Sequence, residues 1–483
     1  MLSVRLKVKE LNPKIIGFFI VLILIWFYGW HISIENFIYD SSLYWGLGKE
    51  FTSSGKFSWL TYDQPVRGYI LPLISYICMT AADLLGVGEM VLYRFVSAVF
   101  YSFFITVLIP VLYEKITSHK LKLAYILFFF VLVAYFWRGF FLYPLSDFVS
   151  LFFMLVGTYN LISYFKKKNF VHILSAGFFI ALSTIARPSY QIVLIPILVI
   201  FIIHSFIIKK DNYKKSIPVA LIAIILGSSL AYGPQFFINK KNYDIDSPFV
   251  QTGIAFKGSL FTQQLLWGMY IQKYETNNNL VTYPKESVFF YDQQGINLLD
   301  KENIINFKES GLQLPENFTL NQYLSLILKN PLDMVTIYFK HFFNGADLIY
   351  HSVYLNDVYK NRSIFSFFNY SIWFISFLTI CSLFKIKSII KEKYFEISLI
   401  LIIILPALLS IPSAIESRFF LPLFLLNYIL IAYYLLSRKK NYNDLKKYVM
   451  KLAIPYVIYM IICFTLSITT FSTLSDGHYL FHN

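Results

Sequence analysis

Residues 15–30, IIGFFIVLILIWFYGW, form an uninterrupted apolar run, and the segment Tyr39-Asp40-Ser41-Ser42-Leu43-Tyr44-Trp45-Gly46-Leu47 follows it closely. A run of this kind is typical of a helix that spans a bilayer. An ionisable side chain placed just past a membrane exit, among aromatic residues, indicates a candidate functional site. The alternative is that Asp40 caps a short interfacial helix together with its neighbouring serines. Asp40 is therefore the first candidate, and the rest of the chain has to decide between the two roles.

The composition predicts an integral membrane protein. Of the 483 residues, 57% are hydrophobic and only 14% are charged, whereas a soluble domain carries about a quarter of charged residues. Further apolar runs of about 18 to 22 residues recur along the chain, each long enough to cross a bilayer. We expect an all-α, polytopic transmembrane bundle of about eleven helices, within a range of ten to thirteen. The three cysteines lie in apolar stretches, which argues against a disulfide framework or a cysteine-based metal cluster.

The distribution of basic residues predicts the orientation. More than half of the 42 Lys and Arg residues lie in connecting segments that the predicted helices place on the same side of the membrane. The positive-inside rule assigns that side to the cytoplasm. This accounts for the net charge of +15 without a nucleic-acid partner. If residues 69–87 spanned the membrane, several of these basic clusters would move outside, so we expect that segment to be interfacial or re-entrant. The predicted spanning helices are 15–32, 90–113, 122–137, 144–165, 171–187, 189–208, 216–234, 365–384, 396–411, 418–437 and 450–471.

Three regions follow from this layout. Residues 1–234 form an N-terminal transmembrane module whose first outside loop, 33–89, carries Asp40. Residues 235–364 are polar and too long for a plain connection, so they predict a large extracytoplasmic loop with some structure of its own. Its later part, 323–343, is amphipathic and predicts a helix on the membrane surface. Residues 365–483 supply the C-terminal transmembrane helices.

The predicted outside face collects a specific set of polar side chains. Carboxylates there can act as a general base or hold a divalent cation, and arginines suit a phosphate ligand because the guanidinium fork matches phosphate oxygens. We therefore assign catalytic candidates, phosphate-binding candidates and supporting residues among them. The catalytic candidates are Asp40 and Asp147, the phosphate-binding candidates are Arg67, Arg138, Arg187, Arg418, Lys340 and His341, and the supporting residues are Tyr44 and Glu416.

Most of these residues also have a structural explanation. An arginine at a helix end can extend to lipid headgroups, and Lys340 can contact anionic lipids. Asp147 lies where a helix begins and can cap it. Glu416 can form an ion pair with Arg418, and His341 can simply pack at the interface.

Four stretches contain most of these polar side chains, and in chain order they are Tyr39-Asp40-Ser41-Ser42-Leu43-Tyr44, Arg67-Gly68-Tyr69-Ile70-Leu71-Pro72-Leu73, Ala186-Arg187-Pro188-Ser189 and Glu416-Ser417-Arg418-Phe419-Phe420-Leu421-Pro422. Together they resemble motifs of the GT-C superfamily of membrane glycosyltransferases. The likeness is to the bacterial relatives of protein O-mannosyltransferases and to the aminoarabinose transferase of lipid A, and it covers most of the chain in layout. Two details depart from the family pattern: Ser146-Asp147 stands where a Thr-Glu or Asp-Glu pair is frequent, and Ser417 separates Glu416 from Arg418.

The resemblance implies an inverting glycosyltransferase that takes its sugar from a polyprenyl-phosphate donor. Asp40 would be the base that activates a hydroxyl of a lipid, glycan or protein acceptor on the extracytoplasmic face. Superfamily members differ in their use of a divalent cation, and Asp40 with Asp147 is the pair that would hold Mg²⁺ or Mn²⁺. The resemblance implies a location in the plasma (inner) membrane, and the basic residues within 5–14 predict a cytoplasmic N-terminus. The bias toward Lys, Ile, Asn, Phe and Tyr indicates a prokaryotic source.

Two other functions remain as alternatives. An O-antigen polymerase or ligase also has many helices and takes lipid-diphosphate oligosaccharides, but it relies on paired arginines in a late outside loop, where residues 235–364 have only Arg362. A flippase or transporter of lipid-linked glycans predicts charged residues in mid-helix along a pathway. Here the charges lie at helix ends.

Overall fold

A computed structural model describes most of the chain. The described residues are 12–32, 36–207, 211–255, 259–276, 287–308, 311–313, 315, 317–348, 362–384, 392–435 and 442–475. Several predicted cytoplasmic basic residues lie outside these ranges, namely Arg5, Lys7, Lys9, Lys209, Lys210, Lys385, Lys387, Lys391, Arg438, Lys439 and Lys440.

The described chain is predominantly helical, and the expectation of a helical membrane protein is confirmed. Eight helical stretches are long and apolar enough to cross a bilayer: Pro13–His31, Glu89–Thr117, Leu123–Leu142, Ser146–Lys167, Pro188–Ile207, Ile217–Tyr243, Ser363–Leu383 and Lys451–Thr470. Four shorter apolar helices are Ile70–Leu85, Phe170–Ala186, Tyr394–Leu409 and Ser417–Tyr433. The count of eleven spanning helices stays a prediction.

The N-terminal part of the chain consists of helices joined by short turns. In order they are α1 (Pro13–His31), α2 (Tyr39–Leu47), η1 (Gly48–Thr52), η2 (Trp59–Thr61), α3 (Ile70–Leu85), α4 (Glu89–Phe103), η3 (Phe104–Leu108), α5 (Ile109–Thr117), α6 (Leu123–Trp137), η4 (Arg138–Leu142), α7 (Ser146–Lys167), α8 (Phe170–Ala186), η5 (Pro188–Val193), α9 (Leu194–Ile207) and α10 (Asp211–Tyr243). α10 does not stop at the predicted boundary of 234 but continues through Pro234 to Tyr243, so that boundary lies inside a helix.

A structured unit follows α10, which we call the inserted unit and define as the described residues within 252–348. It contains five helices and two small antiparallel hairpins, β1–β2 and β3–β4, which the all-α prediction did not include. The predicted amphipathic helix over 323–343 is two helices, because Pro331 opens a new one after Asn330. The elements are α11 (Thr252–Ala255), α12 (Leu260–Tyr270), β1 (Ile271–Thr276), β2 (Ser287–Tyr291), α13 (Gln293–Lys301), β3 (Asn306–Lys308), β4 (Gly311–Gln313), α14 (Leu320–Lys329) and α15 (Pro331–Ala346).

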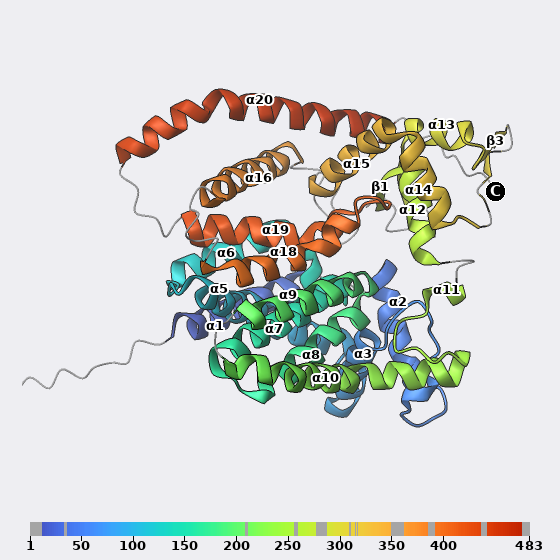
Figure 1. The fold of residues 1–483 in the computed structure, drawn as a ribbon, viewed down its shortest axis with the longest axis vertical. Coiled ribbons are helices and arrows are strands. Elements are labelled where there is room, and N and C mark those ends of the chain that lie inside the picture. The colour runs from blue at the N-terminus through green and yellow to red at the C-terminus, as the bar shows by residue number, and fades with distance from the viewer. Residues whose placement is uncertain are drawn as a thin grey trace, which may run out of the picture.

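The C-terminal helices complete the bundle. They are α16 (Arg362–Phe384), α18 (Tyr394–Leu409), η8 (Ser417–Phe420), α19 (Leu421–Ile429), η9 (Leu430–Leu435) and α20 (Tyr442–Ser475). In Figure 1, helices such as α10, α18 and α20 run in roughly the same direction, and the inserted unit lies at one end of the bundle.

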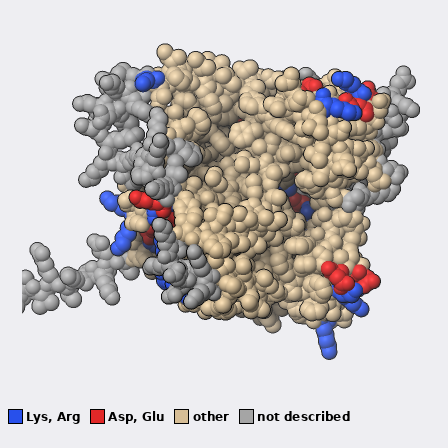
Figure 2. Space-filling view, in the orientation of Figure 1, with Lys and Arg blue, Asp and Glu red and all other residues tan. Residues whose placement is uncertain are grey.

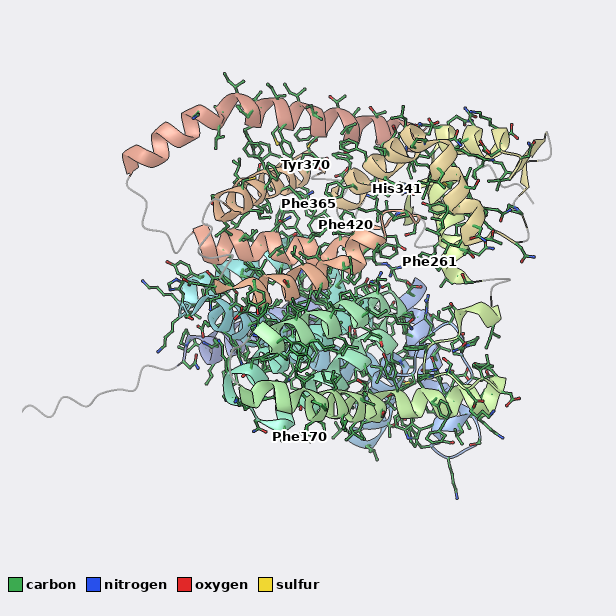
Figure 3. All side chains as sticks on the ribbon, viewed as in Figure 1. Phe170, Phe261, His341, Phe365, Tyr370 and Phe420 are labelled. Carbon is green, nitrogen blue, oxygen red and sulfur yellow. The ribbon has the colours of Figure 1, made fainter. Side chains whose placement is uncertain are left out.

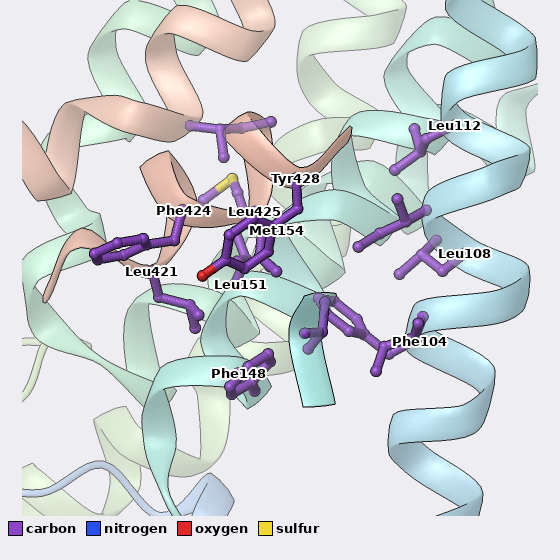
Figure 4. Packing of buried hydrophobic residues seen from close by; sticks show 14 of the residues in the cluster. Phe104, Leu108, Leu112, Phe148, Leu151, Met154, Leu421, Phe424, Leu425 and Tyr428 are labelled. Carbon is purple, nitrogen blue, oxygen red and sulfur yellow. The ribbon is translucent and has the colours of Figure 1, made fainter. Parts of the chain in front are cut away.

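The N-terminal and C-terminal helices share one aromatic-rich core. Phe148 and Met154 of α7 belong to the same buried cluster as Phe424 and Tyr428 of α19 (Figure 4). The indole nitrogen of Trp137 donates a hydrogen bond to the hydroxyl of Tyr428 at 3.1 Å, which satisfies two polar groups inside this core. The two parts of the chain are therefore packed into a single bundle, and side chains from both can meet at its end.

Candidate functional site

Asp40 is not the cap of its helix. α2 begins at Tyr39, and the cap position belongs to Ile38, whose backbone nitrogen donates to the hydroxyl of Ser41 at 3.1 Å. This leaves the Asp40 carboxylate free to face two arginines. Its Oδ2 lies 2.8 Å from Nη2 of Arg418, and its Oδ1 lies 3.5 Å from Nη2 of Arg67. The capping alternative for Asp40 is therefore wrong.

The turn before α3 brings Arg67 to the cluster. The hydroxyl of Tyr62 donates to the backbone oxygen of Arg67 at 2.9 Å and fixes the turn. The next residue, Gly68, packs directly on the end of α8, where an added Cβ would lie 2.1 Å from the carbonyl oxygen of Ile185. Only glycine allows this approach of two backbones. The Arg67 guanidinium lies over the ring of Tyr44, 5.5 Å from its centroid.

Asp147 and Arg187 form the buried back of the cluster. Asp147 lies in the first turn of α7, where the positive end of the helix dipole favours a carboxylate. Its side chain is only 2% exposed, and it forms an ion pair with Arg187, which follows the last residue of α8. Arg187 also lies over the ring of Phe419 at 4.8 Å. Next to Asp147, the hydroxyl of Ser146 accepts a hydrogen bond from Tyr44 at 3.2 Å.

Arg418 joins the parts of the cluster. Its Nη2 donates to Glu416 Oε1 at 3.1 Å and also contacts Asp40, and its Nη1 lies 3.9 Å from Asp147 Oδ2. The expected ion pair with Glu416 therefore exists, but it is one part of a larger network. Five separate segments thus bring together most of the residues that we predicted, namely Asp40, Tyr44, Arg67, Asp147, Arg187, Glu416 and Arg418.

The cluster is balanced in charge and partly open. Three carboxylates face three guanidinium groups. Figure 2 shows a small group of acidic and basic atoms in a hollow beside α2, on a face that is otherwise nearly free of charge between its edges. Burial disfavours the charged form of Asp40, but the positive charges of Arg418 and Arg67 outweigh it and lower the pKa of this carboxyl. Asp40 is therefore an ionised carboxylate at neutral pH.

The two ends of α7 support a position of the charged cluster near one face of the membrane. Asp147 lies in the first turn of this helix, and Lys166 and Lys167 lie in its last turn. The 22 residues of α7 extend about 33 Å at 1.5 Å per residue, close to the thickness of the hydrocarbon core. Lys166 donates to the backbone oxygen of Lys115 at 2.8 Å, so two of the predicted cytoplasmic clusters meet at the lysine end.

Three predicted phosphate-binding residues have other partners. Lys340 of α15 contacts both carboxylate oxygens of Asp292 at 3.1 Å and thereby joins α15 to the start of α13. His341 is fully buried, and its Nδ1 lies 2.6 Å from the carbonyl oxygen of Ile411. Arg138 donates to the backbone oxygen of Tyr135 at 2.8 Å. We grouped these three with the cluster because of their residue type and their predicted side of the membrane. The structure does not bring them into the cluster.

Sequence reasoning missed how the inserted unit holds the turn that carries Glu416 and Arg418. Burial lowers the pKa of His341, so its ring is neutral at pH 7 and Nδ1–H donates to Ile411. On the same turn, Gly268 of α12 packs so closely that an added Cβ would lie 2.3 Å from the oxygen of Pro412. Figure 3 shows His341 near Phe420, where α15 meets η8. His341 therefore supports the turn and is not part of the cluster.

Replacing His341 with Ala is expected to lower the free energy of unfolding by about 1–3 kcal/mol, because the Ile411 carbonyl then loses its donor. The midpoint of thermal unfolding in detergent measures this effect. His341→Asn is the matched control, since the amide nitrogen of Asn can replace Nδ1, and it is expected to retain part of the stability. Equal losses in the two variants would show that this hydrogen bond does not hold the turn.

Comparisons of the chain with protein-family models, with curated proteins and with solved structures found no match.

Proposed function

We propose that the protein is an integral-membrane glycosyltransferase that moves a sugar from a polyprenyl-phosphate donor to a hydroxyl of a lipid, glycan or protein acceptor. The observation that carries the proposal is Asp40, an ionised and partly exposed carboxylate held between Arg67 and Arg418 at the end of a transmembrane bundle. An arginine pair beside a carboxylate offers both a base for a hydroxyl and donors for a phosphate.

The reaction uses each of these groups once. Asp40 takes the proton of the acceptor hydroxyl while the hydroxyl oxygen attacks the anomeric carbon of the sugar. The bond between that carbon and the phosphate oxygen breaks, and polyprenyl phosphate leaves with the bonding electron pair. Arg67 and Arg418 stabilise the charge on the leaving phosphate. A single displacement of this kind inverts the configuration at the anomeric carbon.

The arrangement supports a location at the extracytoplasmic face of a plasma membrane. The cluster lies at the end of α7 opposite Lys166 and Lys167, and the positive-inside rule assigns lysine-rich ends to the cytoplasm. A polyprenyl phosphate places its headgroup at this depth when its chain lies in the bilayer. The bias toward residues of AT-rich codons supports a prokaryotic source.

The test is to incubate the purified full chain in lipid nanodiscs with a radiolabelled sugar on polyprenyl monophosphate. We expect release of labelled sugar to water or to a mixed acceptor extract, and no release by heat-treated protein. Turnover of a diphosphate-linked oligosaccharide alone would favour the polymerase or ligase alternative. Turnover of neither donor, combined with movement of an intact lipid-linked glycan between leaflets, would favour a flippase.

A further inference from the structure

The guanidinium of Arg418 lies among three carboxylates, and each of its three nitrogens has a carboxylate oxygen near it. Nε lies 2.5 Å from Glu416 Oε2, Nη2 lies 2.8 Å from Asp40 Oδ2, and Nη1 lies 3.9 Å from Asp147 Oδ2. The carboxylates come from three separate segments. The other two arginines of the cluster pair with single acids, Arg67 with Asp40 and Arg187 with Asp147.

A divalent cation does not fit these carboxylates as they stand. Mg²⁺ requires oxygen ligands at about 2.0–2.1 Å in an octahedral arrangement, so its ligands must converge on one small volume. Here the planar guanidinium already lies between the acids that would have to converge. Among the described residues, no group of three or more His, Cys, Asp and Glu side chains is arranged to hold a metal ion.

The charge balance leads to the same result. Arg67 and Arg187 also pair with acids of the cluster, so three guanidinium groups already compensate three carboxylates. The attraction of the three carboxylates for a further cation is therefore offset by the repulsion of the three arginines, which a partly buried site screens only weakly.

We propose that Arg418 serves as the fixed cation of this site, and that its guanidinium takes the place between Asp40, Asp147 and Glu416 where a divalent metal ion would otherwise bind. An arginine is suited to this role because it remains charged at any physiological pH and its donors reach several acceptors in fixed directions. The proposal deepens the proposed function, on which its chemical meaning rests, but its contacts and its test do not depend on sugar transfer.

The test measures Mn²⁺ binding to the full chain in nanodiscs by electron paramagnetic resonance, together with the unfolding midpoint. In wild type we expect no Mn²⁺ binding at this site. The single variant Asp40→Asn is therefore expected to bind as much Mn²⁺ as wild type does. Arg418→Met leaves the three carboxylates without their shared cation, so Mn²⁺ is expected to bind there and to raise the midpoint by about 3 °C near saturation. Adding Asp40→Asn to this variant is expected to remove both effects.

Arg138→Met is the matched control, because it removes an arginine that donates to a backbone oxygen outside the cluster. It is expected to respond to Mn²⁺ as wild type does. Equal responses of wild type and Arg418→Met would overturn the proposal. Where Arg418→Met does not fold, the wild-type comparison decides alone: Mn²⁺ binding that Asp40→Asn abolishes overturns the proposal, and its absence is the expected result. Neither readout requires the donor, so a wrong substrate class would leave this test intact.

Discussion

Replacing Asp40 with Asn is expected to lower the rate of sugar transfer by about 10²–10⁴-fold, which is the usual contribution of a general base. Asn keeps the size of the side chain but cannot take a proton from the acceptor hydroxyl. We expect the loss in the turnover rate at a saturating concentration of donor. Radiolabelled sugar on polyprenyl monophosphate measures this rate. Unchanged turnover by this variant would exclude Asp40 as the base.

Asp63→Asn is the matched control, because Asp63 lies in the same predicted outside loop but is exposed. We expect it to transfer sugar at the wild-type rate.

The pH profile of sugar transfer provides a second check on Asp40. Arg418 and Arg67 lower the pKa of Asp40 against the effect of burial, so wild type should lose activity only below the ordinary range of a carboxyl group. Arg67→Gln removes one of these positive charges and is expected to move that acidic limb toward higher pH.

Replacing Arg187 with Met is expected to lower the free energy of unfolding by about 3–5 kcal/mol, the usual cost of leaving one member of a buried ion pair without its partner. The exposed fraction of the Asp147 side chain is 2%, so water cannot replace the lost guanidinium. Arg418 is the remaining cation near it, at 3.9 Å. Denaturant-induced unfolding in mixed micelles measures the loss.

The double variant Arg187→Met with Asp147→Asn separates charge from packing. If the unpaired carboxylate causes the loss, neutralising it is expected to restore most of the stability, although the contact of Arg187 with Phe419 stays absent. A double variant that is as unstable as Arg187→Met would assign the loss to packing instead.

The sequence was informative wherever one physical requirement acts on a short stretch. Apolar runs predicted most of the long helices because a bilayer demands about twenty consecutive apolar residues. Polar residues at the ends of those runs predicted which side chains share a face. Asp40, Arg67 and Arg418 could be grouped for this reason, although they are far apart in the chain.

Pairing within the group could not be predicted, since it depends on how distant segments pack. Arg418 reaches three carboxylates because α12 and α15 of the inserted unit hold its turn, and the contact of His341 with Ile411 joins residues 70 positions apart. Lys340 and His341 were misplaced for the same reason, because residue type gives no information about a partner such as Asp292. The two hairpins were not predicted, because short strands in a polar segment have no continuous apolar pattern.

The equal numbers of carboxylates and guanidinium groups have a consequence for how a ligand finds the site. A neutral cluster exerts little attraction beyond a Debye length of about 8 Å, so it cannot draw an anion from solution. The lipid-linked donor that we propose would instead reach it by lateral diffusion within its leaflet. The frequency of encounter then follows the surface density of that lipid and varies little with ionic strength.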